Sequence, residues 1–114
     1  MAVNSQTPPL PLFQGTVDLL VLRTLLPGAM HGYGIATAVA ERTGGELNIE
    51  DAALYQALHR LERQRLIEAE WGPSENNRRA RFYTLTARGR KRLQEDAATW
   101  RRYSRAVEAV LQGG

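Results

Sequence analysis

The sequence predicts a mainly α-helical fold with a small β-hairpin and a long C-terminal helix. Three observations support this prediction. Leucines between residues 54 and 61 recur at the spacing of one helical face. Two stretches with alternating apolar residues flank a cluster of Gly, Pro and Asn, as the strands of a hairpin do. After residue 86, apolar residues recur at alternating spacings of four and three, the pattern of a coiled coil.

Length and composition describe one domain with terminal extensions. The chain has 114 residues, and its hydrophobic fraction of 43% is enough for a core. It has no cysteine, which excludes disulfides and thiolate chemistry and suits a reducing cytoplasm. The N-terminus does not resemble a secretion signal, and the longest apolar run, residues 19–26, is short and interrupted by Arg23. We therefore expect a cytoplasmic protein with no contact to a membrane.

Charge is distributed unevenly along the chain. Residues 1–57 hold two Arg against five Asp or Glu, a net charge of −3. Residues 58–114 hold thirteen Lys or Arg against seven Asp or Glu, a net charge of +6. A basic half of this kind is typical of proteins that bind nucleic acid or another anionic surface.

The N-terminal half is predicted to contain an arm and two helices. Residues 1–14, with three prolines, are expected to form a flexible arm. A first helix should begin with Thr16 as its N-cap. Because this helix is apolar nearly all round, we expect Leu19 and Leu22 to pack against a second copy of the chain. A second helix should span about residues 32–43, with Tyr33 on its buried side, and end at Gly44-Gly45.

The third helix is the candidate nucleic-acid contact. Leu47 and Ile49 suggest a very short strand before it, and Asp51 is its expected N-cap. One face of this helix is apolar, and the opposite face carries amide, imidazole and guanidinium groups. A plain solvated helix is the alternative for this stretch alone. The candidate contact residues are Ala53, Tyr55, Gln56, His59, Arg60 and Arg63.

The predicted hairpin pairs residues 67–71 with residues 82–85. A hairpin after three helices indicates a winged helix-turn-helix over residues 15–86, in which the hairpin is the wing. Its arginines favour contacts to phosphates or to the minor groove over a merely solvated hairpin. The candidate wing residues are Asn77, Arg78, Arg79 and Arg81.

Residues 87–114 are predicted to form a C-terminal dimerisation helix and tail, with Thr86 as the N-cap. The seam of apolar residues is about two and a half heptads long and favours self-association. The alternative is a helix folded back on its own core. A tryptophan in the seam usually serves packing, although a small aromatic effector could bind near Trp100. The seam residues are Leu93, Ala97, Trp100, Ser104, Val107 and Leu111.

Nothing in the sequence suggests catalysis or a cofactor. His31 and His59 are the only histidines, and they lack metal-ligand spacing. No set of Ser, His and acid is apparent, so we do not expect an enzyme. His31 is expected at the start of a helix or in packing.

Several blocks in order resemble the PadR family of transcriptional regulators, in its short form with a single-helix tail. The resemblance covers roughly residues 13–111, and it implies a homodimeric winged helix that binds operator DNA, usually as a repressor relieved by a signal. The matching blocks are GTVDLLVL (15–22), MHGYGI (30–35), LYQALHRLE (54–62), AEWG (69–72), SENNRRA (74–80), YTLT (83–86) and Gly89.

The chain departs from the family pattern at three positions. Where this chain has Ala53, the family commonly has Ser or Thr, and where it has Gln56, the family commonly has Pro. The amide of Gln56 is able to read adenine. It also tends to place Gly where this chain has Arg65. Because a positive φ would cost an Arg about 1 kcal/mol, we expect the third helix to end differently here.

The sequence therefore predicts a DNA-binding regulator that acts as a two-fold dimer. The alternative from another class is a winged-helix adaptor whose basic face binds an acidic protein.

Overall fold

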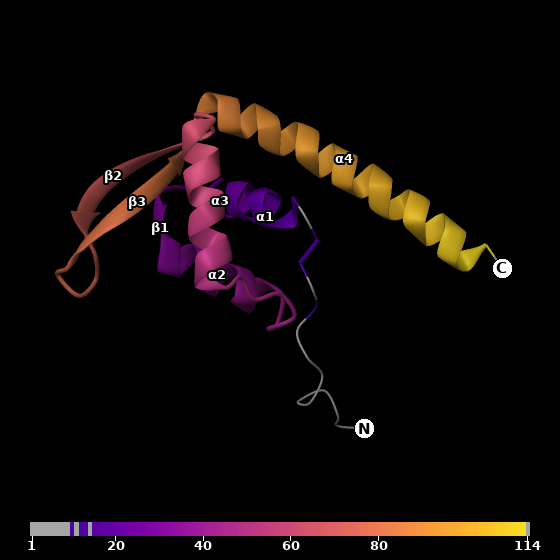
Figure 1. Ribbon diagram of the computed structural model, residues 1–114, viewed down its shortest axis with the longest axis horizontal. Coiled ribbons are helices and arrows are strands. Elements are labelled where there is room, and N and C mark those ends of the chain that lie inside the picture. Colours follow the sequence, from indigo (N-terminus) through magenta and orange to yellow (C-terminus); the bar gives the residue numbers. More distant parts are fainter. Residues whose placement is uncertain (1–9, 11, 14, 114) are drawn as a thin grey trace, which may run out of the picture.

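The computed structural model describes residues 10, 12–13 and 15–113, and it confirms the predicted fold class. Three helices pack together, a small sheet lies at one side of them, and a long fourth helix projects away (Figure 1). The elements are α1 (Thr16–Thr24), β1 (Met30–His31), α2 (Gly32–Arg42), α3 (Asp51–Arg63), β2 (Ile67–Pro73), β3 (Arg79–Leu85) and α4 (Ala87–Gln112).

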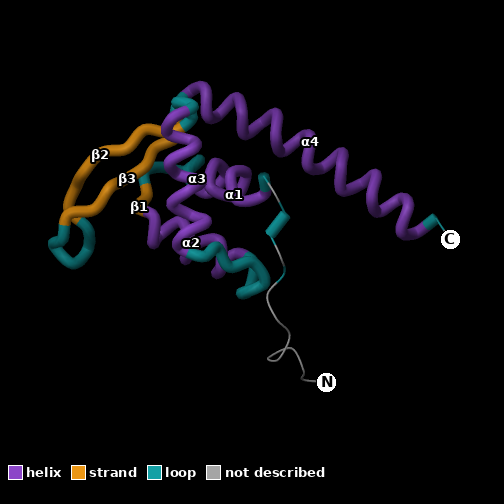
Figure 2. The backbone as a smooth tube through the Cα atoms, viewed as in Figure 1, coloured by secondary structure: helices purple, strands orange, loops and turns teal. Residues whose placement is uncertain are grey.

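The sheet is antiparallel with strand order β1-β3-β2 (Figure 2). In the wing, Ile67 pairs with Leu85 and Trp71 pairs with Arg81. The predicted short strand at Leu47 and Ile49 is wrong, because these residues form no strand. The strand that joins the two wing strands in the sheet is β1, which pairs with β3. Ile49 is instead a core residue of the loop before α3.

The core lies among α1, α2, α3 and the base of the wing. As the sequence predicted, the leucines of α3 are buried on its inner face. Burial of each such side chain contributes roughly 1.5–3 kcal/mol. The core therefore fixes which face of α3 remains in solvent. The largest fully buried side chains are Val21, Leu22, Leu25, Ile35, Leu54, Leu58, Leu61, Leu66 and Ile67.

Two of the predicted helix starts are confirmed and two are wrong. Thr86 caps α4, since its Oγ1 accepts a hydrogen bond from Gly89 N–H at 2.9 Å. His31 caps α2, since its Nδ1 accepts from Gly34 N–H at 3.0 Å. Thr16 is the first helical residue of α1 rather than its cap, and Asp51 has the same place in α3. The residues at those caps, Gly15 and Glu50, make no side-chain capping bond.

The joint between α3, the wing and α4 is tightly packed. Arg65 adopts the left-handed conformation (φ 62°), and Leu66 N–H donates to Leu61 C=O at 3.0 Å. Our expectation that α3 would end differently is therefore wrong: Arg65 occupies the position of the usual glycine, held there by the complete burial of Leu66. A Cβ on Gly89 would lie 2.0 Å from the Leu66 carbonyl oxygen, so only glycine fits there.

The predicted dimer-interface residues Leu22 and Leu93 lie in the core of their own chain. Leu22 is 1% exposed and Leu93 is 6% exposed. Because α2, α3 and α4 of the same chain cover α1, little of its apolar surface is left for a second copy. Leu19 is only half-buried and keeps some surface at the side that faces α4. Placing Leu22 and Leu93 at an interface between chains was therefore incorrect.

Most of the predicted N-terminal arm, residues 1–9, 11 and 14, lies outside the described residues. Leu10 N–H donates to Glu46 C=O at 3.0 Å, and Leu12 packs against the core. The described end of this segment is thus attached to the domain. No helix within residues 10, 12–13 and 15–113 is long and apolar enough to cross a membrane.

Candidate nucleic-acid interface

The outer face of α3 is polar and open to solvent. Gln56, His59 and Arg63 are exposed on successive turns, and Tyr55 is half exposed beside them. They line a shallow surface together with Ala52 and Arg60. The structure therefore brings together most of the predicted contact residues of this helix. Ala53 does not belong to this surface, because it packs against the core.

Arg60 differs from its neighbours on α3 because its guanidinium is bound to α1. Nη2 lies 2.5 Å from Asp18 Oδ1, and Nε lies 3.2 Å from Oδ2. The hydrogen bond to Asp18 raises the pKa of Arg60, and partial burial opposes that effect. We predicted that Arg60 would enter a DNA groove. In this structure its guanidinium donates to Asp18 instead.

The tip of the wing is a tight turn that presents two arginines. Ser74 N–H donates to Arg78 C=O at 2.7 Å, and Asn77 N–H donates to Ser74 C=O at 3.0 Å. Asn77 has φ 63°, a conformation that Asn tolerates better than most residues. Arg78 and Arg79, at the start of the return strand, are exposed.

Trp71 is a wing residue that the sequence analysis did not select. It is 59% exposed, and the guanidinium of Arg79 lies 5.1 Å from the centre of its ring. The strand register could have indicated this contact, because β2 and β3 place these residues on neighbouring strands. The contact restricts the Arg79 side chain on the face of the wing.

Arg81 joins the wing to α3 and does not project from the wing tip. Its Nη2 donates to Glu62 Oε2 at 2.9 Å, and its guanidinium lies 5.8 Å from the Tyr83 ring. Burial raises the pKa of Tyr83, and the nearby Arg81 charge lowers it. The predicted contact of Arg81 with DNA is therefore corrected, because its guanidinium is engaged in an ion pair that joins the wing to α3.

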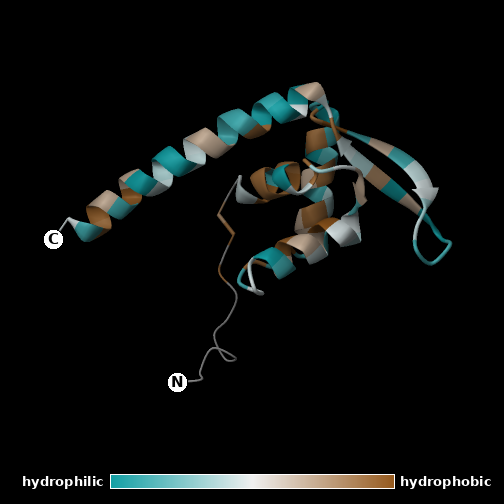
Figure 3. Ribbon diagram, turned by 180° about the vertical axis from the view of Figure 1, so that it is seen from behind, coloured by the Kyte–Doolittle hydropathy of each residue, from teal (hydrophilic) through white to brown (hydrophobic). Residues whose placement is uncertain are grey.

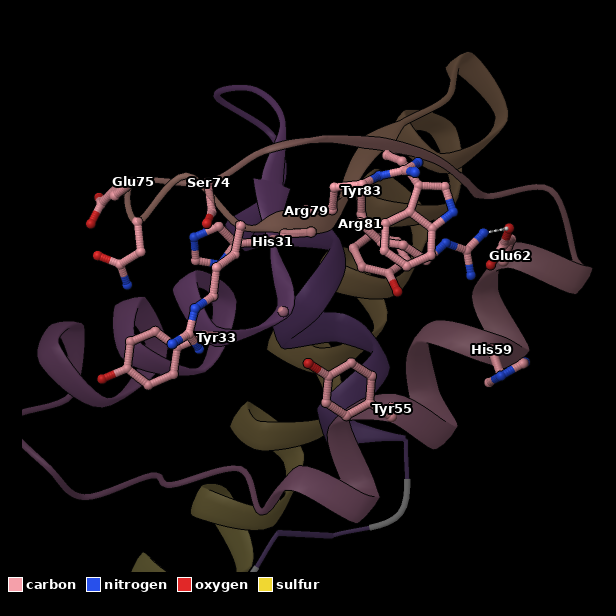
Figure 4. A pocket seen from close by; sticks show the side chains of 15 residues that line it. His31, Tyr33, Tyr55, His59, Glu62, Ser74, Glu75, Arg79, Arg81 and Tyr83 are labelled. Carbon is pink, nitrogen blue, oxygen red and sulfur yellow. Dashed lines mark hydrogen bonds and ion pairs between the residues drawn. The ribbon is translucent and has the colours of Figure 1, made fainter.

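A cleft of about 630 Å³ separates α3 from the wing. His31 and Tyr33 enter it from the start of α2, Tyr55 and His59 from α3, and Arg79 from the wing (Figure 4). The cleft thus combines aromatic rings, hydroxyl groups and guanidinium groups, which are groups that bind phosphate and sugar.

Two residues at the start of α2, Gly32 and Tyr33, shape this cleft. A Cβ on Gly32 would lie 2.7 Å from the Tyr55 hydroxyl oxygen, so this glycine makes room for the Tyr55 ring. Tyr33 is 77% exposed, which corrects our placement of it on the buried side of α2. Its ring stacks on His31 at 6.5 Å between centroids. Periodicity missed Tyr33 because it is at the first turn of the helix, outside the packed region.

Comparison with known proteins decides the family. The profile of the transcriptional regulator PadR-like family matches residues 21–95, most of the chain. The chain belongs to the PadR family. Members of this family are transcriptional regulators that bind DNA, not enzymes. Within the described residues, no group of three or more His, Cys, Asp or Glu side chains is placed to hold a metal ion.

Relatives of this PadR protein cover nearly its whole length. It is 28% identical to an uncharacterized protein of Lysinibacillus sphaericus over 102 residues, which are 90% of this chain and 94% of the relative. A PadR family transcription regulator of Clostridium difficile has 29% identity and a TM-score of 0.74, over 85% of this chain and 99% of that one. A transcriptional regulator of Clostridium thermocellum has 27% identity and a TM-score of 0.76, over 83% and 92%.

Proposed function

We propose that this PadR protein is a cytoplasmic repressor that binds a palindromic operator as a homodimer. One observation carries the proposal: the exposed polar face of α3 lies beside a wing with two exposed arginines, Arg78 and Arg79, which form no ion pair within the described residues. A helix of this kind fits the major groove of B-DNA, and a basic wing fits the adjacent backbone.

The residues of this face have different tasks in the proposal. Gln56 is able to donate to and accept from adenine, and Arg63 is able to donate to guanine or to a phosphate. His59 adds a third polar group to the same row. Arg78 and Arg79 bind phosphates, and so determine affinity more than sequence preference. Tyr55 and Asn77 complete the contact as hydrogen-bonding groups at the helix flank and the wing tip.

The exposed part of α4 is the proposed dimer contact. Beyond Leu93 the helix leaves the domain, and apolar patches continue along it (Figure 3). Trp100, Val107 and Leu111 are all exposed. A row of large apolar side chains on a projecting helix needs cover, and its spacing of four and three fits a second copy of the same helix. We assign Ala97 and Ser104 to the same contact, between the large side chains of the row, and Leu19 of α1 to its edge.

A two-fold dimer presents two copies of α3 related by symmetry. The proposed operator is therefore palindromic, with half-site centres about 10 bp apart or a multiple of that spacing. Occupancy of this operator represses transcription in the proposal, which is what the resemblance to the PadR family implies.

Selection of bound duplexes from a random pool tests the proposal. The expected product is a palindrome, and sedimentation of the protein with that duplex should give two chains per site. A single asymmetric half-site bound by one chain would contradict the dimer. A salt titration on random duplex separates the adaptor alternative, because a protein-binding adaptor has no appreciable salt-dependent affinity for DNA.

A groove beside α4 favours one further proposal, a small aromatic effector near Trp100. It has a volume of about 680 Å³, within the range of small-molecule sites, and it runs between the start of α1 and the middle of α4. Phe13, Trp100 and Tyr103 contribute aromatic rings to its wall. In a Trp71→Phe variant, Trp100 is the sole tryptophan. Its fluorescence should then respond to aromatic compounds, and an unchanged emission would contradict this proposal.

A further inference from the structure

Arg60 lies on α3, the helix that we propose to face DNA. Its guanidinium, however, is directed to Asp18 of α1. Gln56 and Arg63, one turn before it and one turn after it, are exposed, and all three border the same shallow surface. The Arg60 guanidinium makes two hydrogen bonds to Asp18, which lies 42 residues earlier in the first turn of α1. Asp18 thus occupies donors that would otherwise be available to a phosphate.

The ion pair between Arg60 and Asp18 is partly exposed to solvent. The Arg60 side chain is 43% exposed and that of Asp18 is 24% exposed. A bidentate pair is held more firmly than a single contact, but an ion pair with solvent contact is still screened by salt. Without its carboxylate partner, a long guanidinium side chain on this helix would be free to reach the DNA backbone. Any effect of Asp18 on DNA binding would therefore act through Arg60, because Asp18 itself lies in α1.

We infer that Asp18 is a specificity-determining residue, which withholds Arg60 from phosphates and thereby limits binding to random DNA. This inference rests on the DNA-binding function proposed above. Nonspecific binding is almost entirely electrostatic, and every added phosphate contact strengthens it. In the operator complex the base contacts of Gln56 and its neighbours fix the register of α3. A freed Arg60 therefore adds more to random binding than to operator binding.

The opposite reading is that the pair only joins α1 to α3. In that case, loss of either partner loosens α3, and affinity falls for all DNA. In the inferred role, loss of Asp18 tightens random binding, whereas loss of Arg60 leaves it unchanged. The two readings thus differ in the sign of the effect of Asp18.

The experiment measures affinity for a random duplex between about 50 and 200 mM salt for four proteins: the parent, Asp18→Asn, Arg60→Met and the double variant. For Asp18→Asn we expect the slope of log affinity against log salt to steepen by about 0.9, one phosphate contact. This corresponds to affinity about eightfold tighter at roughly 0.1 M salt. Arg60→Met and the double variant should match the parent.

Two controls isolate the pair. Glu46→Gln removes the same charge from an exposed side chain that forms no ion pair within the described part of the chain, and it should leave the slope unchanged. Asp18→Glu keeps a carboxylate and should restore the parental slope. On the selected operator, Asp18→Asn should gain less than on the random duplex, so the ratio of the two affinities should fall.

Three outcomes overturn the inference. A shallower slope for Arg60→Met means that Arg60 already contacts DNA in the parent. Weaker binding by Asp18→Asn with an unchanged slope assigns the pair a joining role alone. An equal gain for Asp18→Asn and Glu46→Gln assigns the effect to net charge. A parent that shows no salt-dependent binding to any duplex refutes the proposed function itself, and thermal unfolding of each variant identifies a change caused by loss of fold.

Discussion

The winged domain and the distal segment of α4 (residues 94–112) differ in how far their apolar side chains are buried. In the domain, α1, α2, α3 and the wing cover one another, so that Leu22 and Leu66 lose nearly all contact with water. In the distal segment, Trp100, Val107 and Leu111 remain exposed on a helix that projects from the domain. The domain thus covers its own apolar side chains, whereas the distal segment leaves exposed the apolar surface that we assign to the proposed dimer.

Val107→Asp should have the largest effect, because it places a charge in the exposed apolar seam of α4. A carboxylate there should separate the proposed dimer while the domain stays folded, since Val107 contributes nothing to the core. A monomer has half the phosphate contacts, so operator affinity should fall by orders of magnitude. Sedimentation and a mobility-shift titration measure both effects. Ala109→Asp, exposed on the opposite side of the helix, should change neither; a dimeric Val107→Asp protein would refute the seam.

Gly89→Ala should instead damage the domain. The new Cβ would meet the Leu66 carbonyl oxygen at 2.0 Å, so α4 has to shift away from the wing joint. Overpacking of this kind costs roughly 1–3 kcal/mol, which thermal unfolding would detect as a lower Tm. Gly28→Ala is the matched control, because its Cβ would meet nothing within 4 Å. Equal melting temperatures for the two variants would mean that the joint is loose.

Gln56→Ala should weaken base preference at the proposed DNA-binding surface and leave the stability of the core unchanged. Gln56 is exposed, so the variant should keep the parental Tm. It should lose roughly 1–3 kcal/mol of preference at one base pair of each half-site. Binding to operators mutated singly at each position measures this loss. A uniform loss over all sequences would instead mean that Gln56 contacts the backbone.

Arg79→Ala should weaken binding to all sequences similarly and reduce the salt slope by about 1, because this exposed arginine is assigned to phosphate. Arg81→Ala offers the contrast within the same strand. Its guanidinium is bound to Glu62, so the number of phosphate contacts, and with it the slope, should stay the same. An Arg79→Ala protein with the parental salt dependence would show that the wing does not touch DNA.

Arg65→Gly should have the smallest effect and the opposite sign. Arg65 has φ 62°, and relief of the left-handed strain should raise the free energy of unfolding by about 1 kcal/mol. Asn77→Gly is the comparison, since Asn77 has φ 63° but tolerates that conformation, and it should gain less. Denaturant unfolding measures both. A loss of stability in Arg65→Gly would mean that the side chain makes a contact worth more than the strain.

Sequence patterns predicted the elements whose signals are local. The leucine spacing identified the buried face of α3, and alternation located the wing to within a few residues. Thr86 was recognisable as a cap because a cap bonds a backbone group three residues away, and His31 lies at a helix start, one of the two places expected for it. Tyr33 and Trp71 were missed, since neither periodicity nor charge distinguishes an exposed ring in a cleft from one in the core.

What the sequence determined by itself is the order of helices and strands, the polar face of α3 and the basic second half of the chain. Tertiary structure decided which of the predicted contact arginines form an ion pair within the described part of the chain. Arg60 pairs with a residue 42 positions away and Arg81 with one 19 positions away, while Arg63, Arg78 and Arg79 stay in solvent. It also placed Leu22 and Leu93 in the core. The physical reason is that helix faces follow from the regular rotation of successive residues, whereas an ion pair or a core contact depends on how distant segments are packed together.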